Sequence, residues 1–308
     1  MGNQFKTWVL MAVLTVLIVW VGRILGGRQG MILAFILAAG MNFFSYWYSD
    51  KMVLRMYHAK EISPGENPEL REIVSYLAGR AGVPVPRIYV IPGQQAPNAF
   101  ATGRNPEHAA VAVTEGLLKL MNKEQITGVL AHEMAHVQSR DILIGSIDAT
   151  MAGAVMILAT MARWSAFFGG GMGDDDEGGI IGLIAMSILA PIAAMMIQMA
   201  ISRSREYHAD SAGAGFAGNP DGLASALEKL GSYSGRLPMK AHPSTAHMFI
   251  VNPLSGRSMM NLFATHPPLA ERIARLRGSG PVTSPPPVSR KPDGIEQAEA
   301  FWKNLEGK

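Results

Sequence analysis

Residues 132–136 read HEMAH, an H-E-x-x-H pattern inside a run, residues 124–140, that contains no Pro and a single Gly. Residues four apart share one face of a helix, so we expect the imidazoles of His132 and His136 to converge on one ion with Glu133 beside it. A metal ion there would act as a Lewis acid and acidify a water molecule, and a neighbouring carboxylate could accept that water's proton. The stretch therefore predicts two metal ligands and a general base.

The alternative interpretation of this pattern is an ordinary polar helix surface that carries two His residues. Three apolar neighbours, Val129, Leu130 and Val137, favour the metal site instead, as does an acidic segment later in the chain. The chain has no Cys, which excludes disulfides, a cysteine nucleophile and a cysteine-ligated metal. His and carboxylate side chains are therefore the expected ligands.

The composition of the chain indicates a protein that lies partly in lipid. Of its 308 residues 48% are hydrophobic and 17% are charged, and the mean hydropathy is +0.16. Ordinary globular domains carry about 25% charged residues. The net charge of +3 gives no reason to expect a nucleic-acid partner, and the basic residues are better interpreted as flanks of membrane segments. The bilayer is the expected partner.

Two apolar segments near the N-terminus predict a helical hairpin over residues 5–49. Residues 7–21 are continuously apolar and, extended to Phe5, approach the length of a bilayer-spanning helix. Residues 31–48 end in a cluster of aromatic side chains, which favour the headgroup level of a membrane. A cleaved signal peptide is the alternative, but Lys6 is the only basic side chain before the first segment and no clear A-x-A site follows it.

Basic residues around this hairpin predict its orientation. Lys51, Arg55 and Lys60 follow the second segment, whereas the turn between the two segments holds Arg23 and Arg28. By the positive-inside rule, we expect the N-terminus and everything after the hairpin to lie in the cytoplasm.

The part of the chain after the hairpin has the composition of a soluble domain. A helix is expected over residues 67–81, with a Pro at its start and a Gly after its end. Residues 87–91 and 109–113 predict short strands, and residues 98–102 a third extended piece. The exposed edge of such a sheet could hold an extended peptide by main-chain hydrogen bonds. Asn122 is expected to cap the helix that carries H-E-x-x-H.

A second pair of apolar segments predicts a second hairpin. We expect the helix of His136 to continue without a break through Asp141 into residues 143–162, which places His136 about 10 Å above the first membrane-embedded turn. Residues 180–201 form the fourth apolar segment. A buried hairpin within a soluble domain is the alternative, but the length of the segments favours lipid.

An acidic pair follows the fourth segment. Glu206 and Asp210 are four apart, so they share one face of a helix, and the hairpin between them and the H-E-x-x-H motif would bring the two together. One of them could complete a zinc site as its third protein ligand while the other accepts a hydrogen bond from a ligand imidazole. His208 is a competing ligand, but it does not pair with Asp210 at helical spacing. The alternative interpretation of this segment is a charged interfacial collar.

The last third of the chain predicts short helices and a tail. Residues 220–230 and 269–276 have the spacing of amphipathic helices that begin after prolines. The region between them is irregular, with His242 and His247 expected on the surface. Residues 278–293 are rich in Pro and Ser, as in a linker.

Taken in order, these features resemble the HtpX-type membrane zinc metallopeptidases, which are relatives of the CAAX prenyl proteases. The resemblance covers residues 1 to about 277 and includes both hairpins. Each short motif is a weak signal alone, but their order along the chain is specific. Besides H-E-x-x-H they are Asn98-Ala99-Phe100-Ala101, Glu206-x-x-x-Asp210 and His266-Pro267-Pro268.

The resemblance implies a zinc site and the role of each of its residues. His132, His136 and Glu206 would hold one Zn²⁺ per chain, and Glu133 would be the general base that assists attack of water on a peptide carbonyl. Asp210 would hydrogen-bond a ligand imidazole.

The same resemblance implies a substrate site. Asn98, together with Ala99 and Phe100, would bind the main chain of the substrate. His266 would be a catalytic residue that stabilises the oxyanion of the tetrahedral intermediate, because a donor aimed at developing negative charge favours the transition state.

For fold class, we expect a mainly α membrane protein, with four transmembrane helices in two hairpins plus an α+β zincin-like catalytic domain that contains a small sheet. The expected domains are the N-terminal transmembrane hairpin (1–50), the first part of the catalytic domain with the zinc helix (51–142), the second transmembrane hairpin (143–201), the second part of the catalytic domain (202–277) and a Pro-rich linker with the C-terminal tail (278–308).

For function, the resemblance implies a membrane-bound zinc endopeptidase, active in stress response and protein quality control. Its partners would be protein or peptide substrates, chiefly misfolded or damaged membrane proteins, and the lipid bilayer. It would be a multi-pass protein of the bacterial inner membrane with the catalytic domain facing the cytoplasm.

Three alternatives remain at this stage. A zinc-containing membrane scaffold is disfavoured because structural zinc sites close all four positions with His or Cys. A small transporter is disfavoured because Asp148 is the only charged residue within the apolar segments. A protease that processes prenylated proteins is disfavoured because four spans do not make a large helical chamber.

Overall fold

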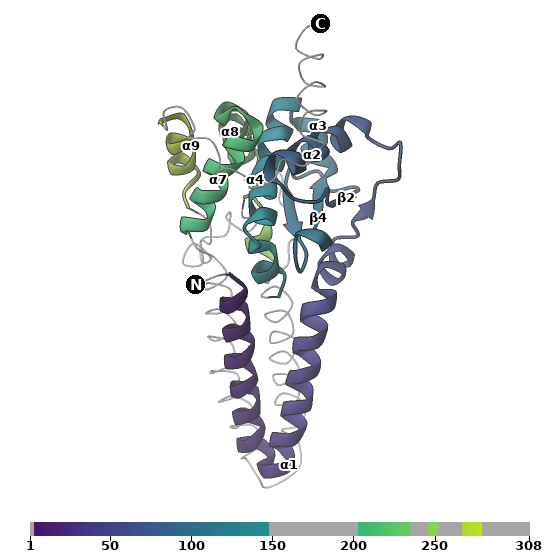
Figure 1. Cartoon of the computed structure of the whole chain (residues 1–308), viewed down its shortest axis with the longest axis vertical. Coiled ribbons are helices and arrows are strands. Elements are labelled where there is room, and N and C mark those ends of the chain that lie inside the picture. Colours follow the sequence, from purple (N-terminus) through teal and green to yellow (C-terminus); the bar gives the residue numbers. More distant parts are fainter. Residues whose placement is uncertain (1–2, 148–202, 235–244, 252–266, 279–308) are drawn as a thin grey trace, which may run out of the picture.

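The structure is a computed structural model that describes residues 3–147, 203–234, 245–251 and 267–278. It consists of a long helical hairpin that carries a helical domain with one small sheet at its open end (Figure 1). Several predictions lie outside the described residues. They concern the second apolar hairpin beyond residue 147, Asp148, His242, His266 and the C-terminal tail.

The N-terminal element is α1, Asn3–Met56, whose two arms lie side by side (Figure 1). The helix is interrupted at Gly26 and Gly27, and Gly27 has φ 55°, a left-handed value that glycine adopts without steric cost. The arms touch closely near the turn, because a Cβ on Gly22 would lie 2.6 Å from the main-chain oxygen of Gly30. The predicted N-terminal helical hairpin is therefore confirmed, and its second arm extends to Met56.

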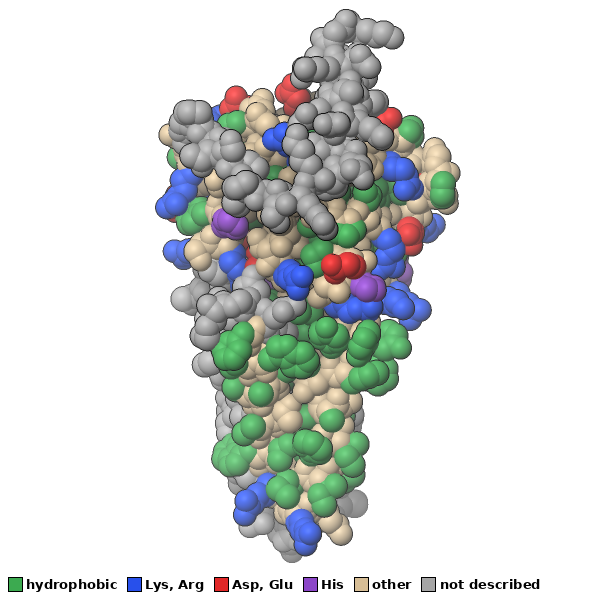
Figure 2. Space-filling model, viewed as in Figure 1, with side chains coloured by type: hydrophobic (Ala, Val, Ile, Leu, Met, Phe, Trp, Pro, Cys, Tyr) green, Lys and Arg blue, Asp and Glu red, His purple; other side chains and the backbone are tan. Residues whose placement is uncertain are grey.

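The surface of this hairpin is largely apolar (Figure 2). Trp20, Leu33 and Phe44 expose half or more of their side chains along its arms. Among the described residues, one helix, Gly26–Met56, is long and apolar enough to cross a membrane, and the first arm has a shorter apolar stretch, Met11–Trp20. Water disfavours so large an apolar surface, which indicates a lipid environment.

The sheet has four strands in the order β1-β2-β4-β3. β2 (Arg87–Ile91) pairs with β4 (Ala110–Thr114) in parallel, whereas β1 (Lys60–Glu61) and β3 (Ala99–Thr102) are antiparallel to their neighbours. The three predicted extended segments are confirmed to within a residue. Strand β1 was not predicted, because two residues are too short to show alternation.

The helices of the domain pack against the sheet and against one another. They are α2 (Pro68–Ala81), α3 (Glu115–Leu120), α4 (Lys123–Gln138), α7 (Arg203–Ala217), α8 (Pro220–Ser234) and α9 (Leu269–Gly278), with 3₁₀ turns at Pro106–His108 and Ala246–Met248. The cap signals in the sequence are confirmed. Gly82 ends α2 with φ 66°, and Asn122 forms a capping box with Gln125 at the start of α4.

Helix α4 is the centre of the domain and packs against α2, α7, α8 and β3. Glycines allow its neighbours to approach closely. A Cβ on Gly128 would lie 2.4 Å from the main-chain nitrogen of Leu223 in α8, and a Cβ on Gly213 of α7 would lie 2.8 Å from that of His132. Helix α7 therefore lies directly against the part of α4 that carries the H-E-x-x-H motif.

The expected continuous helix from His136 into the third apolar segment is wrong. Helix α4 ends at Gln138, Arg140 adopts φ 58°, and a new helical run begins at Asp141 and extends to residue 147. No Pro or Gly marks this break, so the sequence periodicity did not reveal it. The chain bends at this left-handed residue, and the Asp141 carboxylate lies 3.1 Å from Nδ1 of His136.

Candidate metal centre

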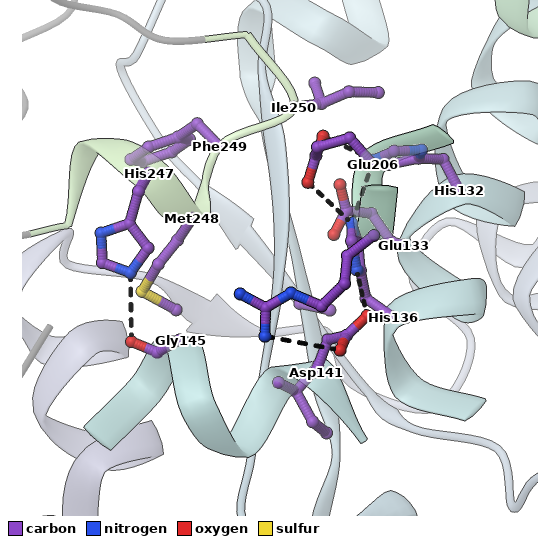
Figure 3. Close-up of a pocket in the computed structure, with 13 residues that line it drawn as sticks. His132, Glu133, His136, Asp141, Gly145, Glu206, His247, Met248, Phe249 and Ile250 are labelled. Atoms are coloured by element: carbon purple, nitrogen blue, oxygen red, sulfur yellow. Dashed lines mark hydrogen bonds and ion pairs between the residues drawn. The ribbon is translucent and has the colours of Figure 1, made fainter. Parts of the chain in front are cut away.

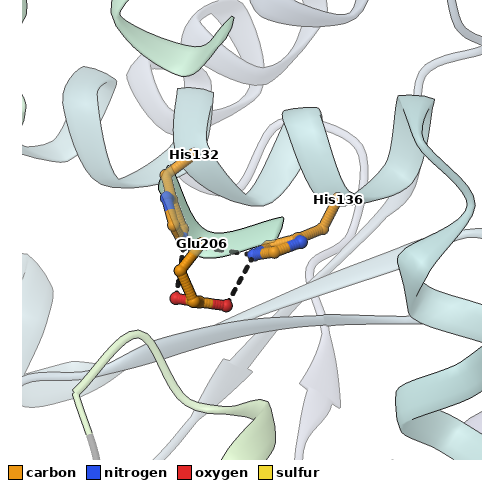
Figure 4. Close-up of side chains that lie close together, drawn as sticks. All are labelled: His132, His136 and Glu206. Carbon is orange, nitrogen blue, oxygen red and sulfur yellow. Dashed lines mark hydrogen bonds and ion pairs between the residues drawn. The ribbon is translucent and has the colours of Figure 1, made fainter. Parts of the chain in front are cut away.

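Three side chains from two helices meet at one point (Figure 4). His132 and His136 come from the buried face of α4, and Glu206 comes from the first turn of α7. The two imidazole Nε2 atoms are 3.2 Å apart. The Glu206 carboxylate oxygens lie 3.8 Å from Nε2 of His132 and 3.5 Å from Nε2 of His136.

These separations suit a tetrahedral metal ion. Zinc binds nitrogen and oxygen at about 2.0–2.2 Å, so two of its ligand atoms are about 3.3–3.5 Å apart. The chemistry of the ligands agrees, because the Nδ1 atom of each imidazole faces a carboxylate, which leaves the two Nε2 atoms to bind a metal. Two Nε2 atoms 3.2 Å apart need a proton or a metal cation between them. The residues thus fit the zinc ion predicted from the sequence.

Each imidazole is oriented by its own carboxylate. His132 Nδ1 donates to Asp210 at 2.9 Å, and His136 Nδ1 donates to Asp141 at 3.1 Å. Such carboxylate partners fix the imidazole tautomer and raise its basicity toward a metal. Asp210 was predicted, whereas Asp141 was not, because on a continuous helix a residue five positions on would point away from His136.

Arg272 is a second residue that the sequence analysis missed. It comes from α9 and donates to both carboxylate oxygens of Asp210, at 2.8 and 2.7 Å. Burial alone would raise the pKa of Asp210, but the positive charge and hydrogen bonds of Arg272 lower it below its ordinary value. Asp210 is thus a stable buried anion. The sequence contains no spacing signal that links these two residues.

The electrostatic environments of the two imidazoles differ. Burial lowers the pKa of His132, which Asp210 only partly opposes. Burial acts in the same direction on His136, but its hydrogen bond to Asp141 and the charges of Glu206 and Glu133 outweigh it and raise the pKa of His136 to about 9. The negative potential behind this shift also attracts a metal cation.

Glu133 lies next to the three converging side chains and is almost fully buried. Its carboxylate accepts a hydrogen bond from the main chain of Ala101 in β3. Burial raises the pKa of Glu133 to about 7, the range in which a carboxyl group both accepts and returns a proton efficiently. The position and the pKa are those expected of a general base.

The site opens into a pocket of about 60 Å³ (Figure 3). One wall is α4 with the helical residues 141–147, and the opposite wall is the segment 245–251. His247 belongs to this wall and is buried, with Nε2 3.3 Å from the main-chain oxygen of Gly145, so the expectation of a surface His247 is wrong. Tertiary packing buries it, since Tyr57 hydrogen-bonds Thr245 and packs edge-on against Phe249.

The structure brings only part of the predicted substrate segment to the pocket. Asn98 is buried and donates through its side-chain amide to the carbonyl of Val251 at 2.9 Å. The carbonyl of Ala99 accepts from Ile250 at 3.2 Å, and the Phe100 ring is fully buried. The next residue of β3, Ala101, does line the pocket.

Two predictions remain, the choice between His208 and Glu206 as a metal ligand and the role of His266. His208 is exposed on α7, whereas Glu206 on the same helix faces the two imidazoles. His266 lies outside the described residues.

Comparison with known proteins finds a family model and relatives that match most of this chain. Residues 64–279 match Peptidase family M48. The chain is 61% identical over 310 residues to the Protease HtpX homolog of Desulfatibacillum aliphaticivorans, covering 99% of this chain and 100% of that protein. It is 62% identical over 309 residues to the Protease HtpX homolog of Desulforapulum autotrophicum, with the same coverage of both chains.

Among solved structures, S. mikatae Ste24p aligns with a TM-score of 0.47 and 23% sequence identity. The alignment covers 80% of this chain and 57% of that one.

Proposed function

Because this chain belongs to peptidase family M48, a family of zinc-dependent metalloproteases, we propose that it is a membrane-bound endopeptidase that cleaves misfolded or damaged membrane proteins at the cytoplasmic face. The observation that carries the proposal is the convergence of His132, His136 and Glu206 at zinc-ligand separations, with buried Glu133 beside them.

The three converging side chains would hold one zinc ion per chain, and among the described residues they are the protein ligands that meet at this point. Catalytic zinc sites have three protein ligands and keep one position open. When bound, the ion would supply Lewis acidity and lower the pKa of a water molecule. Asp210 and Asp141 accept hydrogen bonds at Nδ1, so the Nε2 atom of each imidazole is the one that would bind the ion.

Glu133 carries the proton transfers. Its carboxylate takes a proton from the attacking water and returns it to the amine that leaves the substrate. The main-chain N–H of Ala101 holds the carboxylate in place, and burial keeps its pKa near neutrality for both transfers. His266 is proposed, from the family resemblance, to donate a hydrogen bond to the oxyanion.

The substrate main chain is proposed to add to the edge of β3. This strand is at the end of the sheet, and its residue Ala101 lines the pocket beside Glu133. An extended peptide gains affinity from main-chain hydrogen bonds to such an edge. Asn98 and Ala99, which now bond to residues 250–251, would exchange these partners for the substrate.

The surroundings of the pocket support the proposal of a cytoplasmic active site close to the bilayer. Leu143 and Ile147, just beyond Asp141, pack into the apolar core between the arms of α1. Aromatic and basic side chains gather where α1 meets the domain, with Arg104 over Trp47 and Lys51 over Tyr48. Aromatic rings favour the interface and basic residues the cytoplasmic side, so a multi-pass inner-membrane protein with an inward-facing domain is proposed.

The test uses the full-length protein purified in detergent, wild type beside Glu133→Gln. Zinc content is measured together with cleavage of casein as an unfolded substrate. We expect about one zinc per chain in both proteins, with chelator-sensitive cleavage reduced about 10²–10⁴-fold in the variant. Zinc without cleavage by the wild type would favour a scaffold, and a wild type without zinc would refute the proposal.

A further inference from the structure

Arg272 is the largest fully buried side chain in the described part of the chain and the one Lys or Arg residue there that is buried. Burying the charge of an arginine has a desolvation cost, which hydrogen bonds from its N–H groups to several acceptors can offset. Its exposed neighbours on α9, Arg275 and Arg277, contact surface carboxylates instead. The partners of Arg272 therefore indicate what the charge is used for.

The guanidinium group has partners on α7 and on the segment 245–251, and its Nη2 atom also lies 3.4 Å from Nδ1 of His132 on α4. Nε and Nη2 donate to the two carboxylate oxygens of Asp210 at 2.8 and 2.7 Å. Nη1 donates to the main-chain oxygen of Ile250 at 3.0 Å and lies 3.7 Å from Oε2 of Glu206. Helix α7 and the pocket wall 245–251 thus meet at a single side chain from α9.

The contact with Asp210 determines the position of one candidate metal ligand. Asp210 Oδ1 accepts from both Arg272 Nη2 and His132 Nδ1, so the fork of Arg272 holds the oxygen that orients this imidazole. A lysine ammonium at the same place is a point charge and cannot occupy both oxygens in a fixed plane. The carboxylate that orients the other imidazole, Asp141, lies 3.9 Å from Arg205.

The contact with Ile250 extends the same support to the pocket wall. Ile250 lines the pocket, its carbonyl is bound by Arg272, and its N–H is bound by Ala99 of β3. We propose that Arg272 is a positioning residue that couples the orientation of His132, through Asp210, to the placement of the wall segment 245–251. This inference rests on the proposed function, because it assigns a role within the same site.

The test compares Arg272→Lys with Arg277→Gln in the full-length protein. Arg277 is the matched control, because it lies on the same helix and makes the same two-bonded contact to a carboxylate, Glu228, at 2.6 and 2.9 Å on the surface. Three quantities are measured. They are the Kd for Co²⁺ and Zn²⁺ by chelator competition, the visible absorption spectrum of the Co²⁺ protein, and hydrogen exchange in peptides that cover residues 245–251.

Arg272→Lys is expected to weaken metal binding about 10–100-fold, as the loss of a ligand's hydrogen-bonded support does. The Co²⁺ spectrum should change, because the His132 ring is reoriented, and amides of the wall segment should exchange faster. Arg277→Gln should match the wild type in all three. Arg272→Lys that binds metal with wild-type affinity, spectrum and exchange would overturn the inference.

A double-mutant cycle with Asp210→Asn keeps the inference testable if Arg272→Lys proves poorly folded. If Arg272 acts through Asp210, the effects of Arg272→Gln and Asp210→Asn on metal affinity should be strongly non-additive, and additive effects would refute the coupling. These readouts need no substrate, so a protein that binds metal but cleaves nothing would sink only the proposed function. A wild type that binds no metal would overturn both.

Discussion

At the scale of single residues, each imidazole of the H-E-x-x-H motif is oriented by its own carboxylate partner. His132 is buried and its carboxylate partner Asp210 is held by two hydrogen bonds from Arg272. His136 keeps 16% of its side chain exposed, and its partner Asp141 lies 3.9 Å from Arg205. The orientation of His136 therefore depends on its hydrogen bond to Asp141.

Substitution of Asp141 tests this dependence. Asp141→Asn keeps an oxygen that can accept from Nδ1 of His136 but removes the negative charge that raises the basicity of the ring. We expect the Kd for zinc to rise about 10–100-fold, measured by competition with a chelating dye. Asp221→Asn, exposed on α8, is the control and should bind zinc like the wild type. Unchanged affinity in Asp141→Asn would show that the negative charge of Asp141 does not contribute to metal binding by His136.

At the scale of elements, the distance between α4 and α7 decides whether Glu206 reaches the imidazoles. Gly213 lies seven residues after Glu206 and therefore on the same face of α7. A Cβ at this position would meet main-chain atoms of Ala131 and His132 at 2.8–2.9 Å, and helical backbone cannot yield there. The absence of a side chain at Gly213 thus brings the third candidate ligand within reach.

Gly213→Ala is expected to separate the two helices. The variant should lose about 1–3 kcal/mol of stability from overpacking. Its zinc affinity should also fall, because Glu206 moves with α7. Gly40→Ala is the control, since a Cβ there meets nothing within 4 Å in α1. Thermal unfolding in detergent and chelator competition give the two quantities. A Gly213→Ala protein that melts and binds zinc like Gly40→Ala would contradict this account of the packing.

At the scale of the whole molecule, the site joins segments that are far apart along the chain. Helices α4 and α7 are separated by 64 residues, from Ser139 to Ser202. Their apolar contacts belong to the main core of the domain, which also includes α2, α8 and the sheet. A bound metal would add a link between two elements that already pack together, so it should stabilise the fold without being required for folding.

Removal of the metal tests this statement. Anything that binds only the folded state adds about 4 kcal/mol at a free concentration 1,000 times its Kd. A chelator should therefore lower the unfolding temperature of the wild type by several degrees and leave a cooperative transition. Glu133→Gln should respond equally because it keeps the ligands, whereas His136→Ala should respond little. Loss of any cooperative transition after chelation would show that the fold itself depends on metal.

Much of the fold was predictable because its signals are local. Gly82 and Asn122 cap their helices as their positions in the sequence predict, and β2, β3 and β4 occupy the segments with strand-like patterns. The N-terminal hairpin follows from two apolar segments separated by a glycine-containing turn. The features that could not be predicted are those that leave no periodic pattern in the sequence. The break after α4 depends on the left-handed conformation of Arg140, and no Gly or Pro in the sequence marks this position.

By itself, the sequence determined which side chains share a helical face, because 3.6 residues per turn place His132 beside His136 and Glu206 beside Asp210. Tertiary structure alone decided that these faces meet, that Asp141 turns back to His136, and that Arg272 and the wall with His247 close the site. The reason is physical. Helical spacing acts over a few residues, whereas a buried charge or a pocket wall is placed by packing between segments whose separation along the chain carries no signal.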